Sequence, residues 1–309
     1  MARLLDRACA STGWSRPVAL VTGFWRSGTT WLQELLAAAL AAKTTFEPLS
    51  PRIPEYAALM APQRLPGYDT LEAFMPCLDR TPNEALWRYL DDAFHGFCSG
   101  HFTLLCRGTV RESLRRRVVV KCVRLQFSQT AVHERYGVPV IHLRRHPCAV
   151  AASLKRTRWA WSFDGVRLAD LGFRADGHRL ALFGDDAERL AALIGRFDAD
   201  PLSRAAACWA LSERYVEARL ADRPWARILG YEAAVAQPEA VLAELGAFLR
   251  APALGRLGPV RDSPVTEPES RGLSGQARAE AWRHRLSTEE IDRVREIVGL
   301  IFPQVGPAG

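Results

Sequence analysis

Two segments of this chain place arginine and hydroxyl side chains directly after an apolar strand pattern, as phosphate-binding loops do. The first is Val18–Leu32 (VALVTGFWRSGTTWL), in which Gly23 and Gly28 have the G-x4-G spacing of a P-loop. Such a loop points backbone N–H groups at an anion, and the positive end of the following helix adds to the attraction. The segment predicts an anion site, and the alternative is a strand-to-helix turn without a ligand.

This loop lacks the lysine of a nucleoside-triphosphatase P-loop. Where that motif has Gly-Lys-Thr, the chain has Gly28-Thr29-Thr30, and the cation stands earlier, at Arg26. No clear carboxylate for a magnesium ion follows the next two strand patterns. These patterns end in cations instead: Lys121, Arg124, Arg144 and Arg145. The residues favour a group transferred by cations alone, without a bound metal.

The second segment is Val140–Leu154 (VIHLRRHPCAVAASL), again an apolar strand, a cationic loop and a helix opened by proline. An arginine fork binds phosphate oxygens through two N–H groups, and a hydroxyl on the adjacent helix adds a donor. Arg145 and Ser153 supply these groups. Taken alone, so short a pattern favours a solvated strand end at Arg145 and a surface helix position at Ser153.

Together the two segments resemble the sulfotransferases that depend on PAPS, 3′-phosphoadenosine 5′-phosphosulfate. Arg26–Trp31 is similar to the 5′-phosphosulfate loop of that family, and Arg145, Pro147 and Ser153 are similar to its 3′-phosphate motif. The arginine in the first loop resembles bacterial and carbohydrate-type members more than the cytosolic phenol and steroid members. Ala207–Leu211 and Ile228–Glu239 extend the resemblance, which covers about residues 17–50 and 115–300.

The resemblance implies transfer of a sulfuryl group from PAPS to a hydroxyl of a small-molecule, glycoside or lipid acceptor by metal-free in-line attack. It implies a nucleotide site formed by Arg26, Ser27, Gly28, Thr29, Thr30, Trp31, Arg145, Ser153 and Arg271. Trp31 is similar to an adenine-stacking tryptophan, although a tryptophan in a first helical turn also packs well in a core.

Glu47 is the candidate base, because Phe46-Glu47-Pro48 is similar to a segment of carbohydrate-type members. The alternative for Glu47 is an exposed loop position. Lys121 matches a lysine of the family, and Val123 stands where cytosolic members have a catalytic histidine. Arg26 and Lys121 are the cations expected to stabilise the charge that develops on the transferring group.

Two other functions stay open from the residues: a nucleotide-binding P-loop protein without catalysis, and a small-molecule kinase. The acceptor is not identified by any motif. Aromatic side chains that form either an acceptor pocket or part of the core are Trp87, Phe94, Phe97, Trp159 and Trp161.

The elements that must position these residues follow from buried apolar runs. Strands are predicted at Val18–Thr22, Thr44–Glu47, Val118–Cys122, Val138–Leu143 and Arg227–Leu229. Helices are predicted at Thr30–Ala42, Phe127–Arg135, from Pro147, at Pro201–Leu220, at Pro238–Leu249, and from a capping box at Ser287 and Glu290 to about Leu300. This alternation predicts an α/β fold with a mainly parallel, P-loop-type sheet flanked by helices. We expect one domain over residues 1–309, with acceptor-site insertions at approximately 51–105 and 157–195.

The composition limits the partners. The formal charge of the 309 residues is +7, and Lys43, Lys121 and Lys155 are the only lysines among 41 basic residues, which indicates a GC-rich genome. We expect an anionic small molecule, no nucleic acid and no stable membrane insertion, because no apolar run reaches 18 residues. Seven cysteines without a CxxC pair favour a reduced, cytoplasmic location. The oligomeric state stays open.

Overall fold

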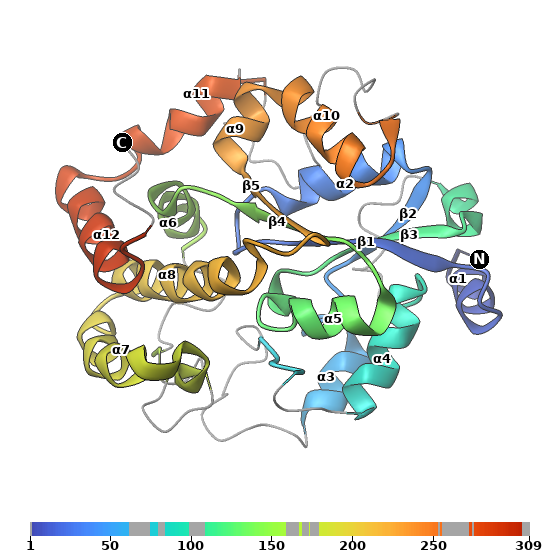
Figure 1. Ribbon diagram of the computed structural model, residues 1–309, viewed down its shortest axis with the longest axis horizontal. Helices are drawn as coiled ribbons and strands as arrows, with labels where there is room; N and C mark the ends of the chain where they lie inside the picture. The colour runs from blue at the N-terminus through green and yellow to red at the C-terminus, as the bar shows by residue number, and fades with distance from the viewer. Residues whose placement is uncertain are drawn as a thin grey trace.

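A five-stranded, entirely parallel sheet forms the centre of the computed structural model (Figure 1). The structure describes residues 2–61, 75–79, 84–98, 109–158, 167–168, 173, 179–252, 254, 272–273 and 275–304. The strands are β1 (Arg16–Thr22), β2 (Ala42–Phe46), β3 (Arg117–Lys121), β4 (Val140–Arg144) and β5 (Ala226–Gly230). Their order in the sheet is β2-β3-β1-β4-β5. Every predicted strand is confirmed to within two residues at each end.

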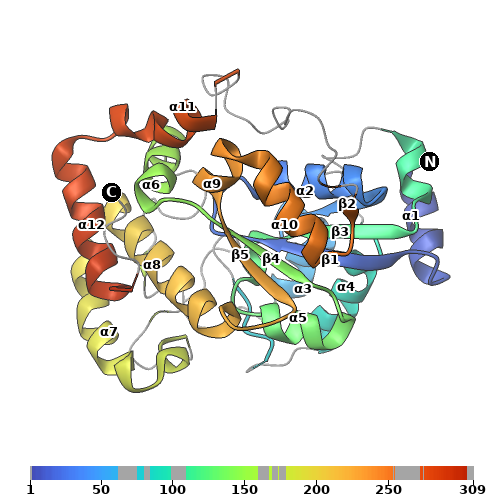
Figure 2. The same cartoon turned by 45° about the horizontal axis from the view of Figure 1, so that its top comes forward.

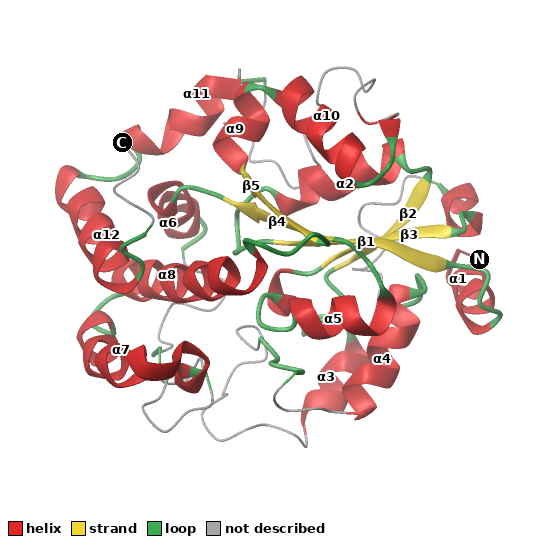
Figure 3. Cartoon of the chain, in the orientation of Figure 1, coloured by secondary structure: helices red, strands yellow, loops and turns green. Residues whose placement is uncertain are grey.

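Helices cover both faces of the sheet (Figures 1 and 3). They are α1 (Ala2–Ser11), α2 (Thr29–Ala39), α3 (Pro54–Met60), α4 (Glu84–Phe94), α5 (Gln129–Tyr136), α6 (Pro147–Arg156), α7 (Ala187–Ile194), α8 (Pro201–Leu220), α9 (Tyr231–Ala236), α10 (Pro238–Phe248), α11 (Gly275–Glu280) and α12 (Thr288–Ile301). Short 3-10 helices are η4 (Val110–Leu114), η5 (Val123–Leu125), η6 (Leu180–Asp186), η7 (Gly195–Phe197) and η10 (Ala281–His284). The prediction of an α/β fold is confirmed.

The apolar strand runs are buried because successive side chains enter opposite layers. On β3, Val118 and Val120 lie in the cluster beneath α4 and α5, whereas Val119 lies in the cluster formed with α2 and α10. All three valines are completely buried. This double coverage explains why the strand reads as a continuous apolar run rather than as an alternating pattern.

Helix starts follow their local signals. Pro147 opens α6, and Ser287 caps α12: its hydroxyl accepts a hydrogen bond from the Glu290 N–H (3.3 Å), and the Glu290 carboxylate accepts one from the Ser287 N–H (2.8 Å). The predicted capping box is therefore confirmed. No helix of the described residues is long and apolar enough to cross a membrane.

The connections bring two loops to the same edge of the sheet. β1 lies between β3 and β4 (Figure 2). After β1 the chain adds β2 and β3 on one side of this strand, and it then crosses to the other side to add β4 and β5. In a parallel sheet this switch leaves a crevice at the carboxyl ends of the strands, where ligands bind. The loops that follow β1 and β4 meet there.

Candidate functional site

The loop between β1 and α2 has the backbone of an anion cradle. Gly28 caps α2 with a left-handed backbone (φ 88°), and a Cβ at this position would come within 2.6 Å of the Tyr231 ring. The first turn of α2, which begins at Thr29, leaves N–H groups without helical acceptors. The hydroxyl of Ser27 is buried and makes no hydrogen bond within the described residues. This loop thus offers several donors to one ligand.

Arg26 joins this loop to the second one. It is a non-glycine residue with a left-handed backbone (φ 67°), and its Nε donates to Ser153 Oγ on α6 (2.8 Å). Its backbone carbonyl accepts a hydrogen bond from the Arg145 guanidinium (2.8 Å). The structure therefore brings Arg26, Arg145 and Ser153 together, although 119 residues separate the two arginines.

Tyr231, the first residue of α9, contacts both loops. Its ring packs against Gly28 on one side, and the Arg145 guanidinium lies 4.5 Å from the ring centre. Arg145 Nε is buried and has no hydrogen-bond partner within the described chain. The Tyr231 ring holds the Arg145 guanidinium in one orientation. The buried Nε–H of Arg145 costs free energy unless a ligand accepts a hydrogen bond from it.

Glu232 positions the start of the second loop. Its carboxylate accepts from the backbone N–H of His146 (3.0 Å), and burial raises its pKa above the ordinary value. The His146 ring stacks on Trp282 of η10, with 4.6 Å between the ring centres. The loop after β4 is thus held by residues from two later segments of the chain.

A buried ion cluster lies beside the first loop. Glu47 pairs with Lys121 and, at 3.6 Å, with Arg124, and it accepts from the Val123 N–H (3.2 Å). Arg124 also lies over Trp25 of the β1–α2 loop, 5.8 Å from the ring centre. The exposed-loop alternative for Glu47 is wrong, because this residue is only 5% exposed. The carboxylate and the two cations stand together next to the anion cradle.

Beneath both loops lies a network of buried polar side chains. His142 on β4 contacts Thr22 at the end of β1 (3.0 Å) and Gln129 (3.1 Å) through Nδ1. Its Nε2 faces the Glu213 carboxylate on α8 (3.0 Å), which also accepts from Arg144 (2.8 Å). Thr22 ends β1 and His142 lies two residues before the end of β4, so this network ties together the strand ends from which the two loops leave the sheet.

The remaining predicted residues divide into three groups. Thr29 and Thr30 lie buried in the first turn of α2. Trp31 is buried in the cluster between α2 and the sheet, so the structure places it in the core. Arg271 lies outside the described residues, as do Trp159 and Trp161.

The aromatic acceptor pocket is not formed by the residues of α4. Trp87 and Phe94 pack in the cluster against β3 and α5, where the Phe94 ring stacks on Tyr136 with 4.2 Å between the centres. They are core residues because the amphipathic α4 packs on one face of the sheet. Phe97 is half-buried and lies beneath Arg7. Within the described residues no three His, Cys, Asp or Glu side chains gather closely enough to hold a metal ion.

Comparison with known proteins gives the family of the chain. A model of the sulfotransferase family matches residues 17–253, which contain both anion loops and the Glu47 cluster. The chain belongs to the sulfotransferase family. This enzyme has no match among curated proteins.

Solved structures similar to this sulfotransferase include other members of the class. One is a sulfotransferase domain from the curacin biosynthetic pathway, with 18% identity, 91% of this chain and 96% of that chain covered, and a TM-score of 0.43. Another is the sulfotransferase domain of the Synechococcus PCC 7002 olefin synthase, with 18% identity and a TM-score of 0.41. The match covers 91% of this chain and 94% of that chain. A retinol dehydratase crystallised with retinol and PAP has 15% identity and a TM-score of 0.41. The match covers 96% of this chain and 84% of that chain.

Sequence reasoning missed several residues of the sulfotransferase site. Arg124 stood out only as a cation at a strand end, and its contact with Glu47 depends on how η5 turns after β3. Tyr231 and Glu232 carried a resemblance but no assigned contact. His142 and Glu213 gave no signal, because a lone histidine in a strand and a lone glutamate in a helix fit many roles.

Proposed function

We propose that this sulfotransferase transfers the sulfuryl group of PAPS to a hydroxyl group of a small-molecule, glycoside or lipid acceptor, by in-line attack and without a metal ion. The observation that carries the proposal is the pair of anion loops joined through Arg26, Arg145 and Ser153. Two joined loops suit a ligand that carries phosphate at two positions, as PAPS does at its 5′ and 3′ carbons.

The unsatisfied donors fit such a ligand. The Ser27 hydroxyl and the N–H groups at the start of α2 would hold the 5′-phosphate, with Thr29 and Thr30 beside them. Arg145 Nε is a buried donor without an acceptor among the described residues, and with Ser153 it would hold the 3′-phosphate. Arg271 on the 3′-phosphate completes the proposed set, whereas Trp31, which is buried in the core beneath α2, is not assigned to the adenine.

PAPS supplies an activated sulfuryl group, whose sulfur–oxygen bond to the 5′-phosphate breaks while the bond to the acceptor oxygen forms. Glu47 accepts the proton of the acceptor hydroxyl. Arg26 and Lys121 stabilise the negative charge that develops on the oxygens of the transferring and leaving groups. The electron pair of the broken bond leaves with adenosine 3′,5′-bisphosphate, and the sulfated acceptor is the second product.

Calorimetry with adenosine 3′,5′-bisphosphate tests the nucleotide site directly, and absence of binding would overturn the proposal. Labelled PAPS incubated with an extract of the producing organism, followed by mass analysis, then identifies the acceptor. Transfer from ATP with Mg²⁺ in the same extract, with none from PAPS, would show a small-molecule kinase instead.

Variants of the ion cluster separate an enzyme from a nucleotide-binding protein. Glu47→Ala and Lys121→Ala are expected to lower kcat by about 100-fold or more while nucleotide affinity stays within about threefold. Lys155→Ala is the matched control, because Lys155 forms an exposed ion pair with Glu290. Equal turnover in all three variants would remove Glu47 and Lys121 from the mechanism.

We also place the enzyme in the cytoplasm. The six described cysteines are all buried and none of them is in a disulfide, which suits a reducing compartment.

A further inference from the structure

Exposed apolar side chains gather at one place on the described surface. Of the five large apolar side chains exposed there, Leu4, Trp14, Val110 and Leu114 belong to α1, η4 and the turn after α1. These two helices pack against each other, and the Trp14 indole donates to the Leu114 carbonyl (3.0 Å). We call this surface, formed by residues 4–16 and 109–117, the α1–η4 face.

Six arginines belong to the two segments that carry these apolar side chains: Arg7, Arg16, Arg111, Arg115, Arg116 and Arg117. The Arg116 guanidinium lies over the exposed Trp14 ring, 4.7 Å from its centre. The two acidic residues of the face are engaged locally, since Asp6 is buried against Lys43 and Glu112 pairs with Arg115 at 3.4 Å. The face is therefore strongly cationic.

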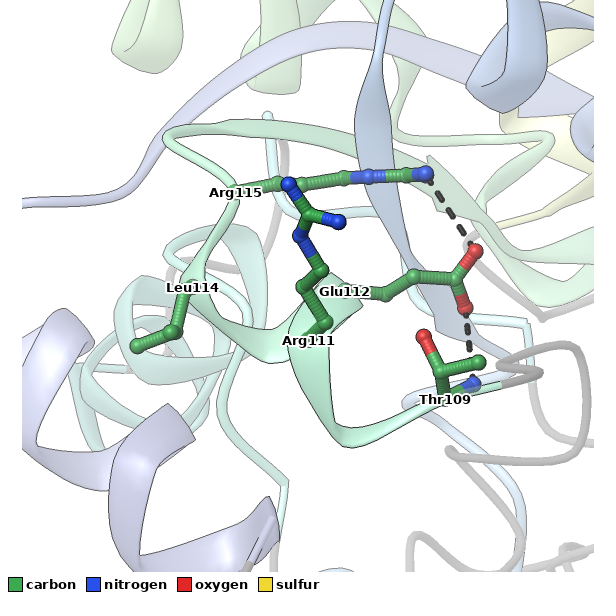
Figure 4. A pocket seen from close by; sticks show the side chains of 5 residues that line it. All are labelled: Thr109, Arg111, Glu112, Leu114 and Arg115. Atoms are coloured by element: carbon green, nitrogen blue, oxygen red, sulfur yellow. Dashed lines mark hydrogen bonds and ion pairs between the residues drawn. The ribbon is translucent and has the colours of Figure 1, made fainter.

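A hollow beside η4 adds a site for an anionic group. It has a volume of about 450 Å³ and is lined by Thr109, Arg111, Glu112, Leu114 and Arg115 (Figure 4). Glu112 accepts from the Thr109 N–H (3.3 Å) within this wall, so part of its charge is used in capping η4. Arg111 and Leu114 both project from η4, and Arg111 points toward Arg115 (Figure 4).

Buried contacts hold the face in one shape. Lys43 on β2 pairs with Asp6 of α1 at 3.5 Å and donates to the Ser113 carbonyl of η4 (3.0 Å), and all three residues are nearly inaccessible. Because one side chain ties both helices to the sheet, the apolar side chains project from a fixed surface.

The charge and shape of this face identify its partner. A second copy of the chain would bring two sets of arginines together, which opposes association. Leu4 is 74% exposed on a convex helix, and protruding apolar side chains insert into a fluid interface without needing a complementary pocket. Arginine and tryptophan are the side chains that anchor proteins at phosphate head groups.

We propose that the α1–η4 face binds the surface of an anionic phospholipid membrane. Leu4, Trp14 and Leu114 enter the boundary between head groups and acyl chains, and the arginines contact lipid phosphates. The strands β1 and β3 begin at this face, with Arg16 paired to Arg117. Because the sheet is parallel, the anion loops after β1 and β4 lie at its opposite edge and face away from the membrane. The bound enzyme therefore takes its acceptor from the aqueous side.

Flotation of the full-length protein with vesicles tests this inference. We expect binding to phosphatidylcholine vesicles that contain phosphatidylglycerol, little binding to phosphatidylcholine alone, and release at high salt. Arg111→Gln with Arg116→Gln, and separately Leu4→Ser with Leu114→Ser, are each expected to lower the vesicle partition coefficient by about tenfold or more. Arg223→Gln is the matched control, because Arg223 is exposed just before β5 at the same edge of the sheet.

Nucleotide binding by every variant is measured in the absence of vesicles and is expected to be unchanged. A failure of membrane binding is therefore distinguishable from a failure of the proposed function. Vesicle binding that does not depend on anionic lipid, or that is unchanged in both double variants, would overturn the proposal. So would a face-dependent dimer in sedimentation, or binding to an acidic protein with none to vesicles. Circular dichroism of each variant shows that a loss of binding is not a loss of folding.

Discussion

The Arg145 guanidinium donates a hydrogen bond of 2.8 Å to the backbone carbonyl of Arg26, and so ties the loop after β4 to the loop after β1. The Arg26 side chain returns the connection by donating to Ser153 on α6 (2.8 Å). Neither loop can therefore move alone. A ligand that binds one loop meets the other in a fixed position, which is the geometry that a nucleotide with two separated phosphates requires.

Arg145→Lys is expected to weaken binding of adenosine 3′,5′-bisphosphate by about 10- to 100-fold. Lysine keeps the charge but cannot both donate to the Arg26 carbonyl and present a planar fork over Tyr231. Loss of one hydrogen bond to a charged group corresponds to about 1.5–3 kcal/mol. Calorimetry measures the change, with exposed Arg293→Lys as control. An affinity equal to that of the unchanged protein would show that Arg145 does not bind the nucleotide.

Gly28→Ala is expected to destabilise the fold and to abolish nucleotide binding. The new Cβ would lie 2.6 Å from the Tyr231 ring on a left-handed backbone, so the loop or the ring must shift. Gly137→Ala is the matched control, because its φ is also positive (+63°) but nothing lies within 4 Å of the new Cβ. Thermal unfolding should show a loss of about 1 kcal/mol for Gly137→Ala and a clearly larger one for Gly28→Ala. Similar losses in the two variants would contradict the close packing of Tyr231 on Gly28.

The stability of the protein is expected to fall in acid because of Glu213. Burial raises the pKa of this carboxyl, but His142 and Arg144 outweigh burial and hold it below its ordinary value of 4.5. A lowered folded pKa contributes stability that is present above pH 4.5 and is lost as the pH falls through the folded value. Urea unfolding at a series of pH values measures this acid slope.

Glu213→Gln should flatten that slope and cost about 3 kcal/mol near neutral pH, because Arg144 loses its buried partner. Glu217→Gln removes the other partner of Arg144. Because the Glu217 side chain is 40% exposed, this change should cost less than about 1 kcal/mol. If the two variants have the same stability and the same acid slope, the buried network does not hold the loops.

The thiols of Cys122, Cys148 and Cys208 are expected to resist alkylation in the folded protein at neutral pH. Burial raises their pKa values to about 12, 11 and 12, so almost no reactive thiolate forms. Iodoacetamide labelling followed by peptide mass analysis checks this, with the urea-unfolded protein as the fully labelled reference. Rapid labelling of any of the three before unfolding would show that its surroundings open.

Local patterns in the sequence predicted much of this fold. The apolar runs of β1, β3 and β4 are buried on both faces, so each carries its strand signal within a few residues. Pro147 and the Ser287–Glu290 box mark helix starts because both act through the backbone of the helix that they begin. The same patterns left open whether Trp87 and Phe94 line an acceptor pocket or belong to the core, since an aromatic stripe on a helix does not state which layer it faces.

The sequence by itself determined the candidate site residues. They are Arg26 in a loop with P-loop spacing, Arg145 and Ser153 in a second loop, and Glu47 and Lys121 at strand ends. Only the tertiary structure decided which of them meet. Tyr231 reaches both loops, Arg124 joins Glu47 to the first loop, and Glu213 supports His142 and Arg144 from a distant helix. These contacts depend on strand order and on how helices pack across the sheet, which are long-range properties that no short segment of the chain encodes.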